Sequence, residues 1–417
     1  MKLYFETYGC SANQNNTEIM QGIAIKHNHI LVDSFEKADV ILINTCIVKG
    51  PTETKIRRRI QDLQKLNKPI IIAGCMSEIR KNEIKQDKIY FLGVKHIKDL
   101  PKLLNSFSSY IGEQKEIKIS IEKIHKNPVI GITQISEGCF GNCSFCATKL
   151  AKGSLYSFPE EDIIASVKSD LKKGCKEIWL TSQDNASYGV DLGKQKLLQL
   201  LRKIIALPYD FYLRLGMMNP NNVIKIKNEL IEIFKHKKVY KFLHIPIQSG
   251  SNKILKKMNR LYTKKDFLYL VKEFRKEIPN ITISTDIISG FPGETEKDFK
   301  ETLNLLKKIK PEVLNLSKYW PMKGTLASKF KQIPREIVKN RIKKVQQIYK
   351  SFLNNSKWIG WQGRVLVNEK AKIPHAFWAR NPYYKRVLIN SKENLFGKFI
   401  DVKITGIKKN FLIGNQI

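Results

Sequence analysis

The sequence contains no run of about 18 apolar residues, the length that a helix needs to cross a lipid bilayer. Residues 1–10 also lack the charged and then apolar order of a secretory signal peptide. A basic protein of the membrane surface would carry an amphipathic basic helix with an aromatic face, and none is found. We therefore expect a cytoplasmic protein with no membrane partner.

Acidic residues are scarce. There are 38 Asp and Glu against 74 Lys and Arg, which gives a formal net charge of +36. Such an excess repels itself and favours a polyanionic partner such as nucleic acid. A lysine-rich proteome or high intracellular salt would produce the same imbalance, so the charge alone leaves both explanations open.

Cysteine is also sparse, with seven residues in a chain of 417. In a reducing cytoplasm disulfides are rare, so these cysteines are expected to include metal ligands. Groups of cysteines that lie close together are therefore the candidates for a metal site.

The chain is long enough for several domains. In residues 1–105, short apolar runs alternate with stretches of helical length, which predicts an α/β domain with a parallel sheet. Residues 106–127 are polar and are predicted to be a linker. The expected strands of the first domain are 2–8, 38–44, 69–73 and 89–94.

Residues 128–355 repeat the strand and helix alternation about six times, so the fold class is α/β here too. Periodicity alone does not separate a (β/α)6 partial barrel from a doubly wound sheet. Both architectures place ligands at the carboxyl ends of the strands. The expected strands are 129–136, 177–181, 211–215, 242–247, 281–288 and 313–316, and the helices are 160–173, 197–205, 221–234, 264–276 and 296–308.

Residues 356–417 contain short β-rich runs at 363–367, 384–389 and 398–406, which predict a small β-barrel. From Asn355 onward there are 12 Lys or Arg and 3 Asp or Glu, a balance of +9. Basic and aromatic side chains together can bind phosphate and stack on bases. The alternative is that the aromatics fill the core of the barrel. They are Trp358, Trp361, Trp378, Tyr383 and Tyr384.

Three cysteines stand in the tract Gly138-Cys-Phe-Gly-Asn-Cys-Ser-Phe-Cys146, just after the first strand of the central region. The thiolates of Cys139, Cys143 and Cys146 can converge on one metal cluster, and no fourth cysteine stands nearby. A [4Fe–4S] cluster with three protein ligands keeps one iron open for a small molecule. Zinc usually takes four protein ligands in structural sites, so it is the weaker alternative.

A second set, Cys10, Cys46 and Cys75, ends three successive apolar strands. Parallel strands would bring these thiolates together at one edge of the sheet, which favours a second cluster with an open iron. Cys175 has no such companion and is interpreted as a free structural thiol.

The Cys139–Cys146 tract resembles the signature loop of the radical S-adenosylmethionine superfamily. That resemblance implies a [4Fe–4S] cluster that binds S-adenosylmethionine and cleaves it to a 5′-deoxyadenosyl radical. Phe145 matches an aromatic residue that commonly lies near the cofactor there.

Over essentially the whole chain, the sequence resembles the radical methylthiotransferases. The resemblance implies an N-terminal cluster domain, a central radical domain folded as a (β/α)6 partial barrel, and a C-terminal RNA-binding barrel called TRAM. The resemblance implies two [4Fe–4S] clusters and catalytic roles for all six clustered cysteines. It also implies an electron donor protein and a sulfur donor, neither of which the sequence identifies. The matching tracts are Glu6-Thr-Tyr-Gly-Cys10-Ser-Ala-Asn-Gln14, Asn44-Thr-Cys46 and Ala73-Gly-Cys75.

Further polar residues follow the predicted strands of the radical domain. At strand ends they could hydrogen-bond a polar cofactor that lies across the mouth of the sheet. Ordinary loop polarity is the alternative for any one of them. They are Gln183, His244, Gln248, Ser249 and Asp286.

Within the family, Cys146-Ala-Thr-Lys-Leu-Ala-Lys-Gly-Ser-Leu-Tyr-Ser-Phe-Pro159 is similar to the archaeal and eukaryotic branch. That branch modifies C2 of N6-threonylcarbamoyladenosine at position 37 in the anticodon arm of tRNA. Lys318 departs from the family's usual arginine and lacks its bidentate fork. The basic residues expected to contact RNA are Arg214, Lys318, Arg380, Lys385 and Arg386.

The sequence is also compatible with other functions. Within the family they are methylthiolation of isopentenyladenosine-37 in tRNA or of a ribosomal protein, although a charge of +36 disfavours a basic protein substrate. Outside it they are a non-catalytic iron–sulfur protein for RNA binding or electron transfer, and a zinc-bound RNA-binding module.

Overall fold

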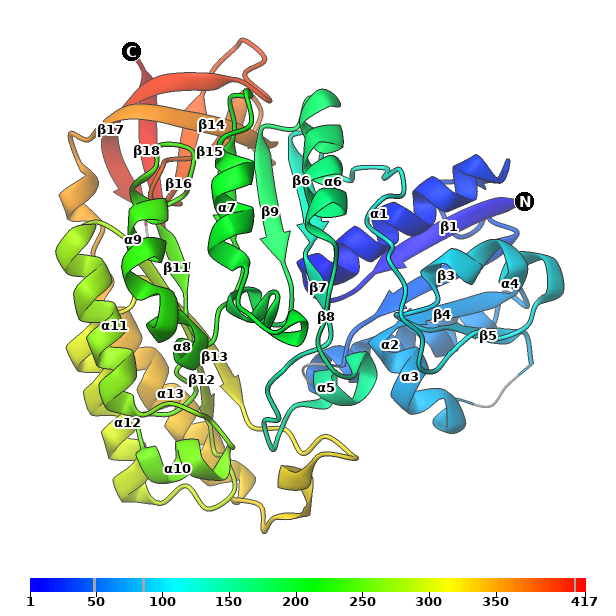
Figure 1. Cartoon of the computed structure of the whole chain (residues 1–417), viewed down its shortest axis with the longest axis horizontal. Helices are drawn as coiled ribbons and strands as arrows, with labels where there is room; N and C mark the ends of the chain where they lie inside the picture. Colours follow the sequence, from blue (N-terminus) through cyan, green and yellow to red (C-terminus); the bar gives the residue numbers. More distant parts are fainter. Residues whose placement is uncertain (48–49, 85–86, 409) are drawn as a thin grey trace.

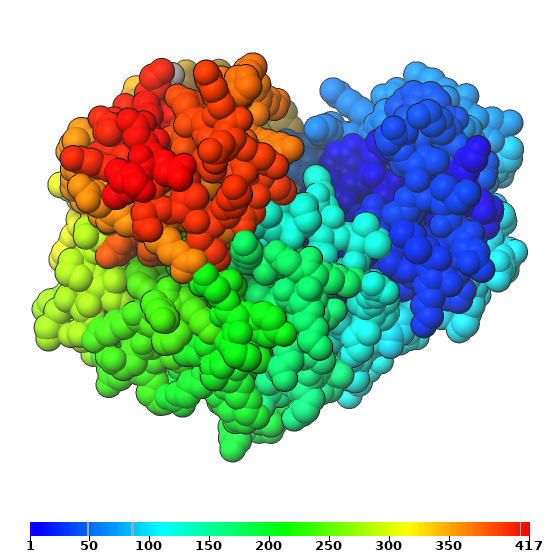
Figure 2. All heavy atoms as spheres, turned by 90° about the horizontal axis from the view of Figure 1, so that it is seen from above, coloured from blue at the N-terminus to red at the C-terminus, as the bar shows by residue number. Residues whose placement is uncertain are grey.

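The structure, a computed structural model, describes residues 1–47, 50–84, 87–408 and 410–417. An N-terminal sheet, a central set of β/α units and a C-terminal barrel follow one another along the chain (Figure 1). Seen from above, the C-terminal barrel and the N-terminal region lie on either side of the central residues, with a notch between them (Figure 2). No helix of the described residues is long and apolar enough to cross a membrane.

The N-terminal sheet has five parallel strands in the order β2-β1-β3-β4-β5. Alternate residues of β3 serve opposite faces: Ile41 and Ile43 pack with α2, whereas Val40 and Leu42 pack with α1 and α4. Because both faces are covered, the strands are continuously apolar, which is the pattern seen in the sequence. The elements are β1 (Lys2–Thr7), α1 (Ser11–Lys26), β2 (Ile30–Leu31), β3 (Val40–Thr45), α2 (Gly50–Gln64), β4 (Ile70–Gly74), α3 (Cys75–Arg80), β5 (Ile89–Leu92) and α4 (Leu100–Ser106).

The central region has six main parallel strands in two three-stranded sheets, β10-β9-β6 and β11-β12-β13. A parallel bridge between Leu213 and Val239 links β10 to the segment before β11. The strands are β6 (Ile130–Gln134), β9 (Glu177–Thr181), β10 (Tyr212–Leu215), β11 (Phe242–His244), β12 (Thr282–Ser289) and β13 (Val313–Lys318), with a small hairpin of β7 (Ser136–Glu137) and β8 (Tyr156–Ser157).

Helices cover the outside of these strands. Two of them begin with a capping box, in which the Thr side chain accepts from the backbone of an Asp three residues later and the Asp accepts in return, at Thr263 and Thr295. The helices are α5 (Ala147–Lys152), α6 (Glu160–Lys172), α7 (Leu197–Ile205), α8 (Pro220–Val223), α9 (Lys227–Lys235), α10 (Asn252–Lys257), α11 (Lys264–Glu277), α12 (Glu296–Ile309) and α13 (Arg335–Phe352).

The order of the central strands decides between the two architectures that periodicity left open. Across the bridge the order is β6-β9-β10-β11-β12-β13, which is the order of the chain. A doubly wound sheet reverses its strand order at a switch point, and this sheet does not. The central region is therefore a (β/α)6 partial barrel, as the resemblance implied.

The C-terminal strands close into a barrel in the order β14-β15-β16-β18-β17. Trp358 is only 2% exposed in its core and contacts Trp361 and Tyr383, so these aromatics belong to the packing. The strands are β14 (Gln362–Lys370), β15 (Ala376–Arg380), β16 (Arg386–Asn390), β17 (Phe399–Lys408) and β18 (Phe411–Gln416).

The segment predicted to be a linker is packed against the rest of the chain. Tyr110 forms an isolated bridge with Leu92, and the side chains of Lys118 and Lys123 are buried. Lys123 Nζ lies 2.5 Å from an Asp170 oxygen of α6. Buried charges of this kind require a partner, so the segment holds the first two regions together and does not swing freely.

Candidate functional site

The tract with Cys139, Cys143 and Cys146 forms a loop that ends where α5 begins, and Cys146 is the residue that precedes the helix. Gly141 donates its N–H to the sulfur of Cys139 at 3.3 Å. A Cβ atom at Gly141 would lie 3.5 Å from that sulfur and 4.0 Å from the sulfur of Cys143. The glycine thus leaves open the space that two of the thiols face.

Arg260, which lies between α10 and α11, contacts this loop. Its guanidinium donates to the Cys143 sulfur at 3.0 Å and to Asn219 Oδ1 at 2.6 Å, and its Nε donates to the Tyr262 hydroxyl at 2.8 Å. Arg260 could not be predicted from the sequence, because 117 positions separate it from Cys143 and no spacing signal connects them.

Hydrogen bonds to cluster sulfurs raise reduction potentials, so Arg260 would act as a positioning residue for the cluster that Cys143 is predicted to hold. We expect Arg260→Gln to lower the midpoint potential of that cluster and to slow S-adenosylmethionine cleavage about tenfold or more, with Arg260→Lys intermediate. Redox titration followed by electron paramagnetic resonance measures the potential. Arg202→Gln is the control because Arg202 is exposed and pairs only with Glu229 among the described residues. An unchanged potential in Arg260→Gln would contradict this role.

Cys10, Cys46 and Cys75 meet at the carboxyl edge of the N-terminal sheet. They follow β1, β3 and β4, which are neighbouring parallel strands. A Cβ atom at Gly9, whose φ is +116°, would lie 3.1 Å from the sulfur of Cys46. Glycine therefore allows the loop before Cys10 to approach Cys46 closely. Cys46 and Cys75 are buried, whereas Cys10 is exposed.

Buried amides and a hydroxyl tie these three loops together. Asn13 donates to the carbonyls of Tyr8 and Thr45 at 2.9 and 2.7 Å, and Asn44 donates back to the Asn13 carbonyl at 2.7 Å. Thr45 Oγ1 donates to Ala73 O at 2.5 Å and accepts from the N–H that follows Cys75 at 3.1 Å. These bonds connect the loops that carry Cys10, Cys46 and Cys75, while Asn44 Oδ1 is left without a partner among the described residues.

Helix α5 connects the two cysteine sets. It starts directly after Cys146, and its residues Ala147 and Ala151 pack in one apolar cluster with Cys75 and Met76. Six helical residues span roughly 9 Å, and the last of them, Lys152, lies close enough to Cys75 to affect the pKa of its thiol.

The last residue of α5 places a buried cation beside the N-terminal cysteines. Lys152 lowers the pKa of the Cys75 thiol, although burial and the neighbouring thiols raise it to about 12. Lys152 and Lys118 both bind Glu137, with Lys152 at 2.5 Å. Burial alone would raise the pKa of Glu137, but the two lysines lower it to about 2. This group of two cations and one anion is therefore suited to balance negative charge on thiolates.

The number of thiols in each set indicates which kind of metal group they could hold. Thiols within each set are close enough for neighbours to raise the pKa of Cys75 and of Cys139, to about 12 in each case, with burial as the largest cause. Yet no three Cys, His, Asp or Glu side chains in the described ranges are placed to hold one metal ion. Three thiols without a fourth cysteine would suit a [4Fe–4S] cluster with one open iron better than structural zinc, which usually takes four protein ligands, and the iron of such a cluster would deprotonate the thiols.

A cavity of about 530 Å³, which we call the upper cavity, lies at the carboxyl ends of β12 and β13. Gly50 and Pro51 at the start of α2 also line it, so it is bounded by both the N-terminal and the central regions. Of the residues predicted from the sequence, it is lined by Phe145, Cys146, Gln248, Asp286 and Lys318. Lys318 lies 4.8 Å from the centre of the Trp320 ring, away from the other predicted RNA contacts.

Two amide side chains predicted to bind the cofactor have unused acceptors. Gln183 Oε1 and Gln248 Oε1 are buried and accept no hydrogen bond from the described residues. Gln248 has φ of +69°, an uncommon conformation for a residue other than glycine. Orphaned acceptors of this kind fit a ligand with amino groups. Ser249, by contrast, is fully buried beside Thr302, and its cofactor contact stays a prediction.

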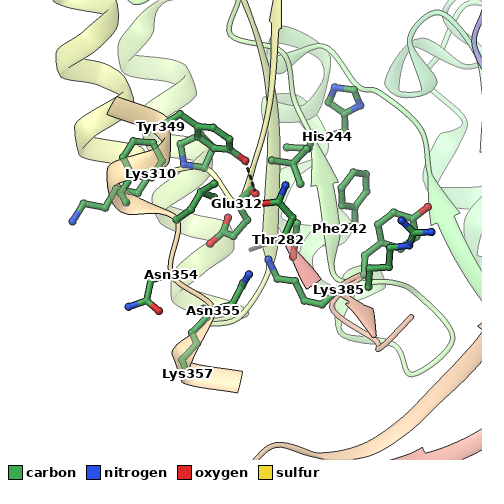
Figure 3. Close-up of a pocket in the computed structure, with 18 of the residues that line it drawn as sticks. Phe242, His244, Thr282, Lys310, Glu312, Tyr349, Asn354, Asn355, Lys357 and Lys385 are labelled. Carbon is green, nitrogen blue, oxygen red and sulfur yellow. Dashed lines mark hydrogen bonds between the residues drawn. The ribbon is translucent and has the colours of Figure 1, made fainter. Parts of the chain in front are cut away.

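His244 faces a second, larger cavity. His244 Nε2 lies 3.1 Å from Asp286, and Asn315 donates to the same carboxylate at 2.7 Å. This network crosses β11, β12 and β13 between the upper cavity and a basal cavity of about 790 Å³ at the amino ends of the strands (Figure 3). Four of the five predicted RNA contacts line the basal cavity. They are Arg214, Arg380, Lys385 and Arg386.

Comparisons with known proteins agree with this arrangement. Residues 2–93 match an uncharacterized protein family designated UPF0004, and residues 133–306 match the Radical SAM superfamily. A probable threonylcarbamoyladenosine tRNA methylthiotransferase from Pyrococcus horikoshii is 38% identical over 100% of both chains. The threonylcarbamoyladenosine tRNA methylthiotransferase of Homo sapiens is 33% identical over 100% of this chain and 74% of its own.

Solved structures share the fold at low identity. The radical S-adenosylmethionine methyltransferase TsrM from Kitasatospora setae superposes with a TM-score of 0.53 at 13% identity, over 76% of this chain and 72% of that chain. The cobalamin-dependent S-adenosylmethionine radical enzyme OxsB gives 0.52 at 13% identity, over 84% and 56%.

Proposed function

The chain belongs to the threonylcarbamoyladenosine tRNA methylthiotransferase family, and from that membership we propose that it converts N6-threonylcarbamoyladenosine at position 37 of tRNA to its 2-methylthio derivative. The observation that carries the proposal is α5, which begins at one three-cysteine set and packs against the other beside the upper cavity. Insertion of sulfur and a methyl group at an unreactive carbon needs both a radical source and a sulfur site close to the same base.

The radical S-adenosylmethionine fold implies one [4Fe–4S] cluster and S-adenosylmethionine, and we assign Cys139, Cys143 and Cys146 to them. When bound, these two groups supply the radical that removes hydrogen from C2 of the adenine. We further propose a second [4Fe–4S] cluster on Cys10, Cys46 and Cys75. The matching arrangement of thiols and the buried Lys152 support it.

The chain's own residues bind and orient the reactants. Gln183 and Gln248 offer acceptors for the amino groups of the cofactor, and Phe145 packs edge-on against Phe291, which fixes its ring beside Cys146. Asp286 is held by His244 and Asn315 at the floor of the upper cavity. A base that enters between the N-terminal region and β13 would therefore meet both cysteine sets.

The net charge of +36 supports a tRNA substrate, and we propose that the anticodon arm is the part that binds. A tRNA-modifying enzyme without a spanning helix in its described ranges is proposed to act in the cytoplasm. A ribosomal protein substrate is disfavoured, because two strongly basic proteins repel each other.

The experiment that tests this function is a competition between two tRNAs. The protein is reconstituted anaerobically with iron and sulfide and given S-adenosylmethionine and a reductant. One tRNA carries threonylcarbamoyladenosine and the other isopentenyladenosine, and nucleosides are identified by mass spectrometry. We expect a methylthio product only from the first tRNA.

Each other outcome identifies a different error. A methylthio product only from the isopentenyladenosine tRNA would leave the reaction intact and overturn the substrate. Formation of 5′-deoxyadenosine with neither RNA changed would point to another substrate, such as a ribosomal protein. No cleavage of S-adenosylmethionine by the fully loaded protein would favour a non-catalytic iron–sulfur protein.

A further inference from the structure

The basal cavity is separate from the site of the reaction. The network of His244, Asp286 and Asn315 lies between it and the upper cavity. Along β12, Asp286 at the upper cavity and Thr282 at the basal cavity are four residues apart, which is roughly 13 Å of strand. A ligand in the basal cavity is therefore not the base that reacts.

The C-terminal barrel forms one wall of this cavity. Backbone N–H of Lys241 donates to Pro382 O at 2.7 Å, and Thr282 Oγ1 donates to Tyr383 O at 2.7 Å. These bonds dock the loop that carries Lys385 onto the amino ends of β11 and β12. The cavity thus exists only because the two regions meet, and its position is fixed by both.

The charge of the lining is unbalanced. Seven basic side chains stand against one acidic side chain, Glu312, among the described residues that line the cavity. Glu312 is already engaged, because Arg275 donates to it at 3.1 Å and Ile283 N–H at 2.9 Å. The basic residues are Arg214, Arg275, Lys310, Lys357, Arg380, Lys385 and Arg386.

Lys385 is the clearest uncompensated cation. Its ammonium makes no hydrogen bond or ion pair within the described part of the chain and points into the cavity (Figure 3). The ammonium of Lys357 also points into the cavity and donates to Asn280 Oδ1 at 3.2 Å. Burial lowers the pKa of Lys385 to about 8. Glu312 opposes that shift, and the charges of Lys357 and Arg275 add to it. A buried cation without a partner is costly, and an anion that binds there would relieve the cost.

Aromatic rings hold two arginines in place, and each arginine keeps an N–H donor that is not used. The guanidinium carbons of Arg214 and Arg380 lie 5.4 and 4.1 Å from the centre of the Tyr384 ring. Their Nε atoms are buried and have no hydrogen-bond partner among the described residues. Aromatic stacking thus fixes each fork without using the Nε–H that could bind an anion.

From this cavity, its charge and its unused donors, we propose that the basal cavity binds one nucleotide of the RNA substrate through its phosphate, with Lys385 and Lys357 as the phosphate contacts. The volume of about 790 Å³ admits a nucleotide, and Phe242, Tyr349 and Phe352 offer aromatic surface for its base. The proposal rests on the proposed function in one respect, that the substrate is RNA. It adds a contact remote from the modified base.

The test measures RNA affinity without turnover. Anticodon stem-loops with and without threonylcarbamoyl at position 37 are titrated by fluorescence anisotropy at several salt concentrations. We expect Lys385→Met and Lys357→Met to weaken binding about tenfold each and to reduce the slope of log Kd against log salt by about one. The loss is the same for both RNAs, because the phosphate is the same. Lys385→Arg retains most of the affinity.

Lys310→Met is the matched control. Lys310 lines the same cavity, but its ammonium points away from the interior (Figure 3), so RNA affinity is expected to stay unchanged. Removal of an uncompensated buried charge does not lower the Tm, so Lys385→Met also distinguishes lost contact from lost fold.

Three outcomes would overturn the proposal. Unchanged affinity and salt slope in Lys385→Met would show that no RNA phosphate reaches the cavity. A loss confined to the threonylcarbamoyl RNA would identify a carboxylate as the ligand instead. Full competition by adenosine monophosphate at micromolar concentration would indicate a site for free nucleotides. Because binding is measured without catalysis, a failed methylthiolation assay would leave these results readable.

Discussion

Cys143→Ala is expected to reduce the formation of 5′-deoxyadenosine to background while RNA binding stays nearly intact. Without the Cys143 thiolate, one iron of the proposed cluster has no protein ligand. No neighbouring cysteine can replace it, because Cys46 and Cys75 belong to the N-terminal set. The basal cavity, where we place an RNA contact, lies at the opposite ends of the strands. Anaerobic assay of 5′-deoxyadenosine by chromatography and anisotropy with tRNA measure the two effects.

The chain offers its own control for this variant in Cys175. That thiol is 2% exposed in the apolar core of the central region, and burial raises its pKa to about 12. Cys175→Ala should retain both clusters and cleave S-adenosylmethionine as the unchanged protein does. Cleavage that persisted in Cys143→Ala would remove this cysteine from the radical site.

The two cysteine sets could be predicted from the sequence because each depends on local order. Cys139, Cys143 and Cys146 occupy one loop, and the other three each follow an apolar run that becomes a neighbouring parallel strand. Once the runs were identified as parallel strands, their carboxyl ends had to share one edge of the sheet. The assignment of clusters to these sets stays a prediction.

The contacts that surround these sets could not be predicted in the same way. Arg260 reaches Cys143 across 117 residues, and Lys152 reaches the N-terminal cysteines only because α5 packs on α3. Such contacts depend on how separate elements dock, which periodicity does not encode. The same holds for the basal cavity, whose basic residues come from β10, α11, the C-terminal barrel and the segments that follow α12 and α13.

The predicted linker shows a related limit. Its polar composition indicated exposure, yet Lys118 and Lys123 are buried because Glu137 and Asp170 pair with them. Lysine is rarely buried unless it is paired, and the partners lie 19 and 47 residues away. Composition within the segment could not reveal those partners.

Cys10→Ala is expected to show the opposite pattern from Cys143→Ala: S-adenosylmethionine cleavage persists, but no methylthio nucleoside forms. Cys10 belongs to the set at the edge of the N-terminal sheet, and the Arg260 bond that holds the radical loop does not involve it. Loss of Cys10 would therefore remove the proposed sulfur site and leave the proposed radical site in place. Mass spectrometry of the tRNA nucleosides and 5′-deoxyadenosine assays on the same reaction measure both effects.

Iron content makes this result decisive. Cys10→Ala and Cys143→Ala should each retain about half of the iron of the unchanged protein, because each would lose one of the two proposed [4Fe–4S] clusters. A Cys10 variant that still formed methylthio product would exclude the N-terminal set as the sulfur site. If instead both variants lost cleavage with half of their iron retained, the sites would be coupled. Helix α5 would then be the physical connection, since it contacts both cysteine sets.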